Sequence, residues 1–242
     1  MNIGIIFAGG IGSRFGLINK PKQFVEVNGK PIIAHTIVHF EKCVSIDKIV
    51  VVCVSDWIDY MNKIKIDYSF DKVEKIVPGG KTGQESIYFG LRAAKEISKN
   101  QESIVLIHDG VRPLINSQLL TDSINNVKQY GSSIACAKMT ETAVEVNENE
   151  ILKAYSRPQI QVAKAPQCFW LSEILEAHED SRKKGKEYID SCSLMMNYKK
   201  SLHFTECGSE NIKITFFEDI YLLQAMLRAR EDELNFANGG LK

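Results

Sequence analysis

The sequence predicts an α/β protein built on a mostly parallel, Rossmann-like sheet from which a β-hairpin arm protrudes. Apolar strand-like runs alternate with amphipathic helical segments over residues 3–138, an order that builds a parallel sheet with helices on both sides. The runs, such as 48–54, are continuous and rich in β-branched residues, which indicates strands buried on both faces. Segment 139–164 instead alternates polar and apolar residues, which is typical of a half-exposed hairpin.

The elements of the first half follow one another in a regular order. The predicted strands occupy residues 3–8, 48–54, 73–77, 103–108 and 133–138. The predicted helices lie between them, near residues 32–43, 57–65, 84–98 and 117–130. Pro31 suits the start of the first helix, because its fixed φ is already helical.

After residue 138 the chain is predicted to leave the sheet and then return. Strand-like pieces at 142–146 and 151–155 form the arm. A two-stranded hairpin is marginal by itself, so we expect the arm to pack on something else, such as a second subunit. The remaining predicted elements are helices near 171–185, 190–199 and 217–232 and a strand at 202–206. We expect one domain over residues 1–232, with the arm at 139–164, and a flexible tail at 233–242.

Composition narrows the class of protein. The chain has 242 residues, 44% of them hydrophobic and 25% charged, as in ordinary globular proteins. Lys and Arg total 30 and so do Asp and Glu, which leaves no global basic field to attract nucleic acid. We expect no membrane span, since no apolar stretch approaches about 20 residues, and no signal peptide, since the N-terminus lacks the charged and apolar regions of one. Six scattered cysteines without a CxxC pair predict neither a zinc site nor a disulfide framework, and hence a reduced, cytoplasmic protein.

The first 24 residues carry the strongest functional signal. The run 3–8 leads into four glycines, at positions 9, 10, 12 and 16, with Arg14 among them and Lys20 and Lys22 following. Glycines let the backbone approach a ligand and turn its N–H groups inward. A strand that feeds a glycine-rich loop with basic residues is what a polyphosphate needs.

This loop has three interpretations. The first is a tight turn that binds nothing. The second is a dinucleotide-binding turn, but that motif expects an acidic residue about 20 residues on, at the end of the second strand, and Asp56 comes too late. The third is a nucleoside triphosphate site other than a P-loop, since GxxxxGK[ST] is absent. In the third, loop amides wrap the β- and γ-phosphates while Arg14 and Lys22 neutralise charge growing on the α-phosphate.

Further motifs, taken in order, resemble a known family. These are AGGIGSR at 8–14, PKQ at 21–23, Gly79 and Gly80 with Ser86, HDGVRP at 108–113, Thr142, Arg157, APQ at 165–167, Asp190 and NIKIT at 211–215. Over roughly residues 2–230 the chain resembles the cytidylyltransferases that act on sugar-alcohol phosphates, the 2-C-methyl-D-erythritol 4-phosphate and D-ribitol 5-phosphate enzymes. The resemblance implies a Rossmann-like sheet of the nucleotidyltransferase (glycosyltransferase-like) type.

The resemblance also implies a reaction. CTP and an alditol phosphate would give a CDP-alditol and pyrophosphate, by in-line attack of the substrate's phosphate oxygen on the α-phosphorus. Catalysis would then be positioning and charge neutralisation. By carry-over the catalytic residues are Arg14, Lys22 and Lys213. Mg²⁺ is the expected cofactor, held mostly by the triphosphate.

The resemblance assigns binding residues as well. Cytosine is read largely by backbone groups and small residues, so the expected CTP-binding set is Ala8, Gly9, Gly10, Ile11, Gly12, Ser13, Gly80, Lys81 and Ser86. The expected alditol-phosphate-binding set is Asp109, Arg112, Thr142, Arg157 and Asp190. In the family, the equivalents of the two arm residues come from the neighbouring subunit of a homodimer, and Arg157 suits bidentate phosphate contact.

Asp109 follows a strongly apolar strand, where a carboxylate needs a cation or solvent. The carboxyl ends of parallel strands form the ligand crevice of open α/β sheets. We therefore expect Asp109 on the edge that carries the glycine loop, as a magnesium- or substrate-side carboxylate. A structural pairing with Arg112 is the alternative. His108 beside it is expected to be a packed, hydrogen-bonded histidine.

The chain departs from the family pattern at four places. Gly83 stands where many relatives have arginine, Ala165 replaces a threonine, Gly110-Val111 replaces Ala-Ala or Ser-Val, and Ser191 follows Asp190 in place of an acidic residue. These departures concern the alditol pocket more than the CTP pocket. The spelling of the first loop favours the ribitol-phosphate branch, which serves surface-polysaccharide pathways, over the isoprenoid branch.

Two other functions compete with a cytidylyltransferase. A catalytically silent nucleotide-binding protein of the same fold would have no need for the four charged residues Arg14, Lys22, Asp109 and Lys213 together. An NAD-dependent oxidoreductase lacks its ribose-binding acidic residue.

Overall fold

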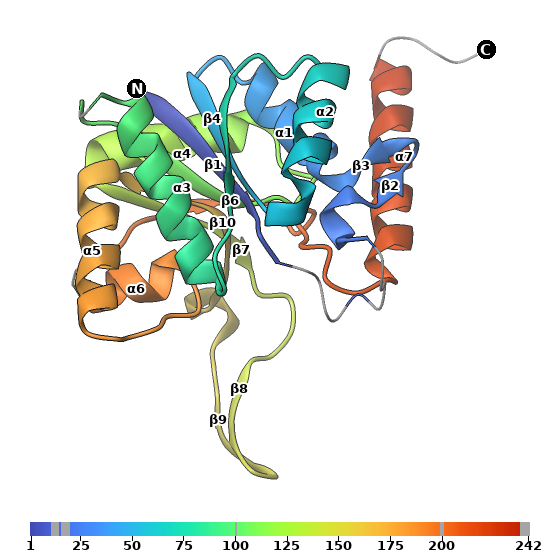
Figure 1. Cartoon of the computed structure of the whole chain (residues 1–242). Coiled ribbons are helices and arrows are strands. Elements are labelled where there is room, and N and C mark those ends of the chain that lie inside the picture. Colours follow the sequence, from blue (N-terminus) through green and yellow to red (C-terminus); the bar gives the residue numbers. More distant parts are fainter. Residues whose placement is uncertain (11–14, 16–19, 100, 199–200, 238–242) are drawn as a thin grey trace.

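A seven-stranded sheet forms the centre of the computed structural model, which describes residues 1–10, 15, 20–99, 101–198 and 201–237. The strands lie in the order β11-β7-β10-β6-β1-β4-β5, with helices on both faces (Figure 1). Four adjacent strands pair parallel with one another, β1 (Asn2–Ala8), β4 (Lys48–Cys53), β5 (Val73–Pro78) and β6 (Ile104–Asp109). The predicted α/β class and mostly parallel sheet are confirmed.

Register brings the carboxyl ends of these strands to one edge. Ala8 lies beside Cys53, and Phe7 lies beside Asp109. Loops that follow different strands therefore meet at this edge, although they are far apart in sequence.

Helices cover the sheet as the continuous apolar strands require. Three pack on one face, α1 (Ile32–Lys42), α2 (Ile58–Asp67) and α4 (Ser117–Tyr130), and three on the other, α3 (Gly83–Ile97), α5 (Leu171–Lys183) and α6 (Ser191–Tyr198). Along β4, Ile49 and Val51 join the first core while Val50 and Val52 join the second. Alternate side chains point to opposite faces, so every position of such a strand must be apolar.

The sequence prediction missed β10 (Gln161–Trp170), which is inserted antiparallel between β6 and β7 (Ser132–Lys138). Residues 161–164, assigned to the arm, already belong to this strand. The pairing with β7 shifts register between Ala163 and Gln167, which accommodates a proline that cannot donate to the ladder. On the other side of β7, β11 (Phe204–Glu206) pairs parallel.

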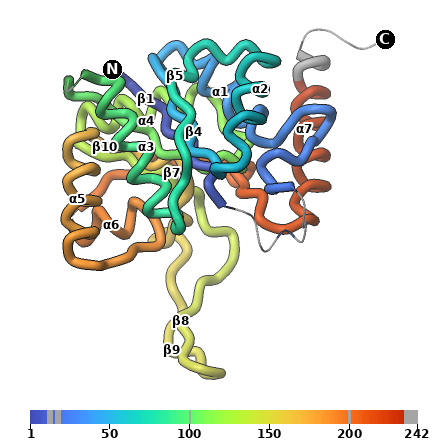
Figure 2. Tube along the Cα trace, viewed as in Figure 1, coloured from blue at the N-terminus to red at the C-terminus, as the bar shows by residue number. Residues whose placement is uncertain are grey.

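The predicted hairpin arm is present as β8 (Val144–Asn147) and β9 (Glu150–Ala154). These strands pair only with each other. They project away from the body of the molecule, at the bottom of Figures 1 and 2. Every residue of both strands is exposed, including Val146, Ile151 and Leu152.

A small third core lies under the last helix. The hairpin β2 (Glu26–Val27) and β3 (Lys30–Pro31) turns at Asn28 and Gly29, both with positive φ. Beside it lies α7 (Asp219–Ala237) (Figure 2), so residues 233–237, predicted as tail, are helical. The buried residues of this core include Val27, Ile32, Val111, Ile214 and Leu223.

Two further properties of the structure concern membrane-spanning helices and cysteines. Within the described residues, no helix combines the length and apolar character that a membrane span requires. All six cysteines are free thiols, and five of them are buried.

Candidate active site

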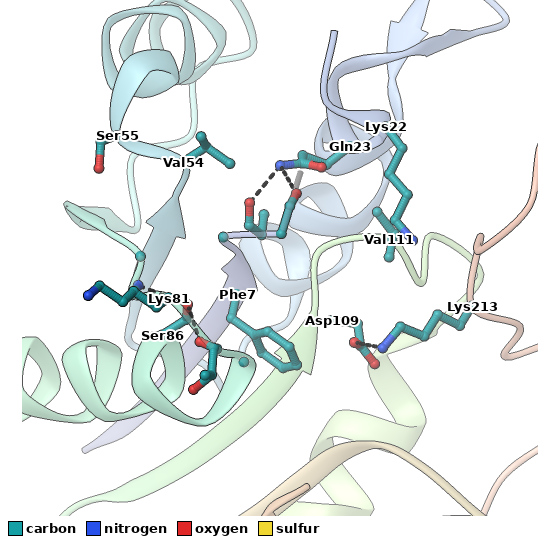
Figure 3. Close-up of a pocket in the computed structure, with 17 residues that line it drawn as sticks. Phe7, Lys22, Gln23, Val54, Ser55, Lys81, Ser86, Asp109, Val111 and Lys213 are labelled. Carbon is teal, nitrogen blue, oxygen red and sulfur yellow. Dashed lines mark hydrogen bonds and ion pairs between the residues drawn. The ribbon is translucent and has the colours of Figure 1, made fainter. Parts of the chain in front are cut away.

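A pocket of about 660 Å³ lies at the carboxyl edge of the parallel strands. Loops after β1, β4, β5 and β6 form its walls, and α3 and the segment around Lys213 complete them (Figure 3). The residues that line it are Phe7, Ala8, Gly9, Gly10, Lys22, Gln23, Val54, Ser55, Gly79, Gly80, Lys81, Thr82, Gly83, Ser86, Asp109, Val111 and Lys213. Most are small or offer main-chain groups, which suits a ligand that approaches the backbone closely.

The pocket collects many of the residues predicted from the sequence. From the predicted CTP-binding set it holds Ala8, Gly9, Gly10, Gly80, Lys81 and Ser86. It also holds Lys22, Asp109 and Lys213. In Figure 3, Lys22 and Lys213 lie on the Asp109 side of the pocket and Lys81 on the opposite side. Arg14, Ile11, Gly12 and Ser13 lie outside the described residues. The individual roles of all these residues stay predictions.

Close backbone contact explains the glycines after β1 and β5. A Cβ added at Gly9 would lie 2.7 Å from Ser86 Oγ, and one at Gly79 would lie 3.0 Å from the Cα of Gly9. Ser86 Oγ accepts a hydrogen bond from the Gly80 N–H at 3.0 Å and donates to the Thr82 carbonyl at 2.9 Å. The two loops therefore touch, and a larger residue at Gly9 would push the second loop away.

Gln23 holds the first loop to the segment that carries Lys22, a role that the sequence did not suggest. Its Nε2 donates to the carbonyl oxygens of Ala8 at 2.6 Å and Gly10 at 3.2 Å (Figure 3). Only 1% of Gln23 is exposed. The available signal was its place in the PKQ motif next to Lys22.

Asp109 sits between two cations. Arg112 Nε donates to Oδ2 at 2.7 Å, and Lys213 Nζ lies 2.5 Å from Oδ1. Burial by itself would raise the pKa of this carboxyl, but Lys213 and Arg112 outweigh that effect and lower the pKa to about 2. The pair with Arg112, which was the structural alternative, is thus present, and Lys213 joins it. In the described part of the chain, Asp109 is the one carboxylate that lines the pocket.

His108 lies in the core beside this cluster. Its ring is fully buried against Phe40, and Nε2 is 3.2 Å from the Arg112 carbonyl oxygen. Burial lowers its pKa to about 4, so the imidazole is neutral at pH 7. It lines neither this pocket nor the adjoining one, and it packs as expected from the sequence.

A second pocket, of about 290 Å³, adjoins the first and shares Phe7, Gly83, Asp109 and Lys213 with it. Its other lining residues are Ile87, Ile107, Arg112, Ala163, Lys164, Ala165, Gln167, Ile189, Asp190 and Ser191. The predicted acceptor residues Arg112 and Asp190 are among them. Asp190 accepts hydrogen bonds from Gln167 Nε2 at 2.9 Å and from the Ser193 N–H at 2.8 Å. The carboxylate thereby caps the start of α6 at the pocket wall.

Gln84, in the first turn of α3, ties this helix to α5 and to the loop before Asp190, a role that the sequence did not suggest. Its Oε1 accepts from the Tyr188 N–H at 2.8 Å, and its Nε2 donates to Ser181 Oγ at 2.9 Å. The amide thus fastens the loop that leads to Asp190 onto the helix that borders the first pocket. No sequence signal distinguished Gln84 from an ordinary helical glutamine.

The two predicted arm residues lie apart from both pockets. Arg157 Nη2 donates to Thr142 Oγ1 at 3.3 Å, and both side chains are exposed. Neither residue lines either pocket. Within one chain, the described structure does not bring them to the other acceptor residues.

Comparisons with known proteins agree with this geometry. The profile of the 2-C-methyl-D-erythritol 4-phosphate cytidylyltransferase family matches residues 3–229. A protein of Streptococcus agalactiae named ribitol-5-phosphate cytidylyltransferase is 48% identical over 235 residues, which cover 96% of this chain and 98% of the relative. A Clostridium botulinum protein named 2-C-methyl-D-erythritol 4-phosphate cytidylyltransferase is 37% identical over 225 residues, or 92% and 96% of the two chains.

A solved structure leads to the same family. The crystal structure of 4-diphosphocytidyl-2C-methyl-D-erythritol synthase from Anaerococcus prevotii superposes with a TM-score of 0.81 at 26% identity. The match covers 94% of this chain and 96% of that one. The fold, the site at the carboxyl edge and the matched length together show that the chain belongs to the 2-C-methyl-D-erythritol 4-phosphate cytidylyltransferase family.

Proposed function

We propose that this chain transfers the cytidylyl group of CTP to an alditol phosphate, with ribitol 5-phosphate as its preferred acceptor. The observation that carries the proposal is the pair of joined pockets that share Asp109 and Lys213. Two adjoining pockets suit two substrates that must react with each other. The preference for ribitol 5-phosphate is supported by the higher identity to the relatives named for that substrate, 48% against 37%.

In the proposed reaction a phosphate oxygen of the acceptor forms a bond to the α-phosphorus of CTP. The bond between that phosphorus and the oxygen that bridges to the β-phosphate breaks, and pyrophosphate leaves. Lys22 and Lys213 both line the larger pocket and would neutralise charge that grows on the α-phosphate and on the leaving group. Arg14 is proposed for the same role from the sequence alone.

We propose that Mg²⁺ takes part, held mainly by the triphosphate. A carboxylate offers about four lone-pair positions, and Arg112 and Lys213 occupy one on each oxygen of Asp109. Asp109 can therefore still offer one oxygen to a hard cation. When bound, the ion would neutralise phosphate charge. Loss of turnover in a chelator, with recovery on added Mg²⁺, tests this proposal.

We further propose that the arm completes the acceptor site of a second copy in a homodimer. The support is its exposed apolar side chains, its lack of partners within the described chain and the distance of Thr142 and Arg157 from both pockets. In such a dimer each complete active site would combine Lys22 of one chain with Arg157 of the other. We expect Arg157→Ala chiefly to raise the KM for the alditol phosphate.

Mixed dimers test the sharing directly. Lys22→Ala and Arg157→Ala chains, refolded together, would form dimers in which one site carries both lesions and the other carries none. The mixture should regain turnover that neither variant shows alone at low acceptor concentration. A fully active monomer in sedimentation, or a mixture with no regained activity, would contradict the shared site.

A cytoplasmic location is also proposed. Six free cysteines with no disulfide within the described chain are typical of a reducing compartment.

Pyrophosphate release tests the main proposal. The protein is incubated with Mg²⁺, each of the four ribonucleoside triphosphates, and either ribitol 5-phosphate or 2-C-methyl-D-erythritol 4-phosphate. Turnover is expected only with CTP, and with a higher kcat/KM for ribitol 5-phosphate. Binding of CTP without turnover with either acceptor would favour the silent nucleotide-binding protein instead.

A further inference from the structure

Lys164 lies in the acceptor pocket at an irregular point of β10. The pairing of β10 with β7 breaks between Ala163 and Gln167. Such irregularities bend a strand and re-aim side chains near functional sites. Here Lys164 lines the 290 Å³ pocket together with Arg112, Asp190 and Lys213. No motif in the sequence marked this lysine.

The backbone around Lys164 is fixed by buried amide side chains. Asn211 Nδ2 donates to the Ala165 carbonyl at 2.6 Å, while the main-chain carbonyl of Asn211 accepts from Arg112 Nη1 at 3.0 Å. Gln167 Nε2 lies 3.4 Å from the Lys164 carbonyl and binds Asp190 at 2.9 Å. One network therefore places the base of the Lys164 side chain relative to Arg112 and Asp190.

The charges of the pocket do not balance without a ligand. Three cations line it, Arg112, Lys164 and Lys213, against two carboxylates, Asp109 and Asp190, which leaves one positive charge. Asp109 serves both Arg112 and Lys213, and Asp190 is engaged by Gln167 and by the start of α6.

Lys164 carries the unshared charge. Its Nζ donates to the Ser209 carbonyl at 3.1 Å, and it forms no ion pair with a carboxylate of the described chain. Partial burial and the neighbouring Arg112 lower its pKa, and Cys207 and Glu210 act in the opposite direction. An anion bound in the pocket would favour the charged ammonium and so counteract the first two effects.

We propose that Lys164 is a binding residue for the phosphate group of the acceptor, acting beside Arg112. The inference rests on the proposed function and adds to it, because it names the group of the alditol phosphate that this lysine recognises. An ammonium with three donors can leave the Ser209 carbonyl for a phosphate oxygen, and charge-assisted hydrogen bonds are stronger than neutral ones. Acceptors with a phosphate would then be favoured over the free alditols.

Steady-state kinetics of Lys164→Met test the proposal. The KM for ribitol 5-phosphate should rise about 10- to 100-fold, the usual worth of a hydrogen bond to a charged group, while the KM for CTP stays unchanged. Lys164→Arg should recover most of the loss, because it keeps the charge. Lys128→Met, which removes an exposed lysine of α4 away from both pockets, is the control.

Inorganic phosphate and free ribitol separate recognition of the phosphate from recognition of the hydroxyl groups. Phosphate should inhibit competitively with ribitol 5-phosphate, and its inhibition constant should rise in Lys164→Met. Inhibition by free ribitol should be the same in both proteins. An unchanged KM and an unchanged phosphate inhibition constant in a folded, active Lys164→Met enzyme would overturn the inference and leave the proposed function intact.

If no turnover is observed, calorimetry with ribitol 5-phosphate distinguishes failure of the proposed reaction from failure of the inference about Lys164. Binding that depends on Lys164 without any pyrophosphate release would support the inference while the proposed reaction fails. Wild-type protein that binds neither ribitol 5-phosphate nor inorganic phosphate would overturn both.

Discussion

The two joined pockets differ in the kinds of residue that line them. The larger one is lined mainly by glycines and other small residues after β1 and β5, whereas the smaller one brings five charged side chains from several elements together with apolar residues. In the first, Gly9 and Gly79 are in backbone contact, so a change moves the chain itself. In the second, a single side chain can change without moving the backbone. We therefore expect relatives to differ less in the larger pocket, the proposed nucleotide half, than in the smaller pocket, the proposed acceptor half.

The departures from the family pattern agree with this division. Three of the four departures, Gly83, Ala165 and Ser191, line the smaller pocket, whereas Val111 of the fourth lines the larger one. Gly83 also borders the larger pocket, and a Cβ there would meet nothing within 4 Å. The substrate that distinguishes this chain from its relatives is therefore expected to be the acceptor, with the nucleotide unchanged.

The largest effect is expected at Asp109, where the two halves meet. Asp109→Asn would leave Arg112 and Lys213 without their carboxylate, and breaking a buried ion pair in this way costs about 3–5 kcal/mol of unfolding free energy. Urea titrations measure the loss. Glu96→Gln, which breaks the exposed pair with Lys75, is the control and should change stability little.

The same residue predicts a pH dependence. The pKa of Asp109 is lowered to about 2 in the folded protein, below the unfolded value near 4. The stabilisation is therefore fully present above about pH 5 and is lost as the pH falls toward 2. Wild-type unfolding free energy should fall over this range by about 2 kcal/mol more than that of Asp109→Asn. Parallel curves for the two proteins would contradict the ion-pair account.

Substitution of Lys22, with the next largest expected effect, tests the larger pocket, the proposed nucleotide half. Lys22→Ala is expected to lower kcat at least about 100-fold, because a single group that stabilises developing charge is typically worth that much. Lys20→Ala offers a matched comparison, since Lys20 contacts Glu26 and Tyr60 and does not line the pocket. Near-normal turnover in Lys22→Ala, or equal losses in both variants, would refute the assigned role.

Two neighbouring glycines test whether backbone contact governs the nucleotide half. Gly9→Ala places its Cβ 2.7 Å from Ser86 Oγ, whereas a Cβ at Gly10 meets nothing within 4 Å. Overpacking of this kind costs about 1–3 kcal/mol, so the Kd for CTP should rise about 10-fold or more in Gly9→Ala. Gly10→Ala should bind CTP normally unless the ligand itself needs that space. Equal affinities of wild type and Gly9→Ala for CTP would contradict the view that close contact between the two glycine loops shapes this pocket.

The smallest effect is expected at Gln84, which ties the acceptor loop to α3. Gln84→Ala removes one hydrogen bond to the loop before Asp190 and one to Ser181 of α5, and such bonds are worth about 0.5–1.5 kcal/mol each. The KM for the acceptor should rise about 3- to 10-fold with the KM for CTP unchanged. Gln118→Ala, on the exposed face of α4, is the control. A rise in the KM for CTP alone would show that Gln84 does not serve the acceptor half.

The local pattern of apolar and polar residues was sufficient to predict much of the fold of this protein. Continuous apolar runs identified β1, β4 and most of β6, because strands buried on both faces consist almost entirely of apolar residues. The edge strand β5 contains Glu74 and Lys75 and is only partly buried. The same sequence pattern also placed Asp109 at the edge that carries the glycine loop, because the carboxyl ends of parallel strands lie at one edge of the sheet. The arm was visible as a segment that alternates without a core to bury it.

The remaining features of the fold and the site were decided only by the tertiary structure, because they depend on which distant segments of the chain come together. The antiparallel insertion of β10 follows from pairing on both edges, which outweighs the weak strand signal of a polar segment with a proline. The ion pair of Asp109 with Lys213, the loop held by Gln84 and the lysine at the β10 irregularity join residues that lie far apart in sequence. Sequence periodicity records which face of an element is buried, while contacts between distant polar side chains are fixed by register and packing.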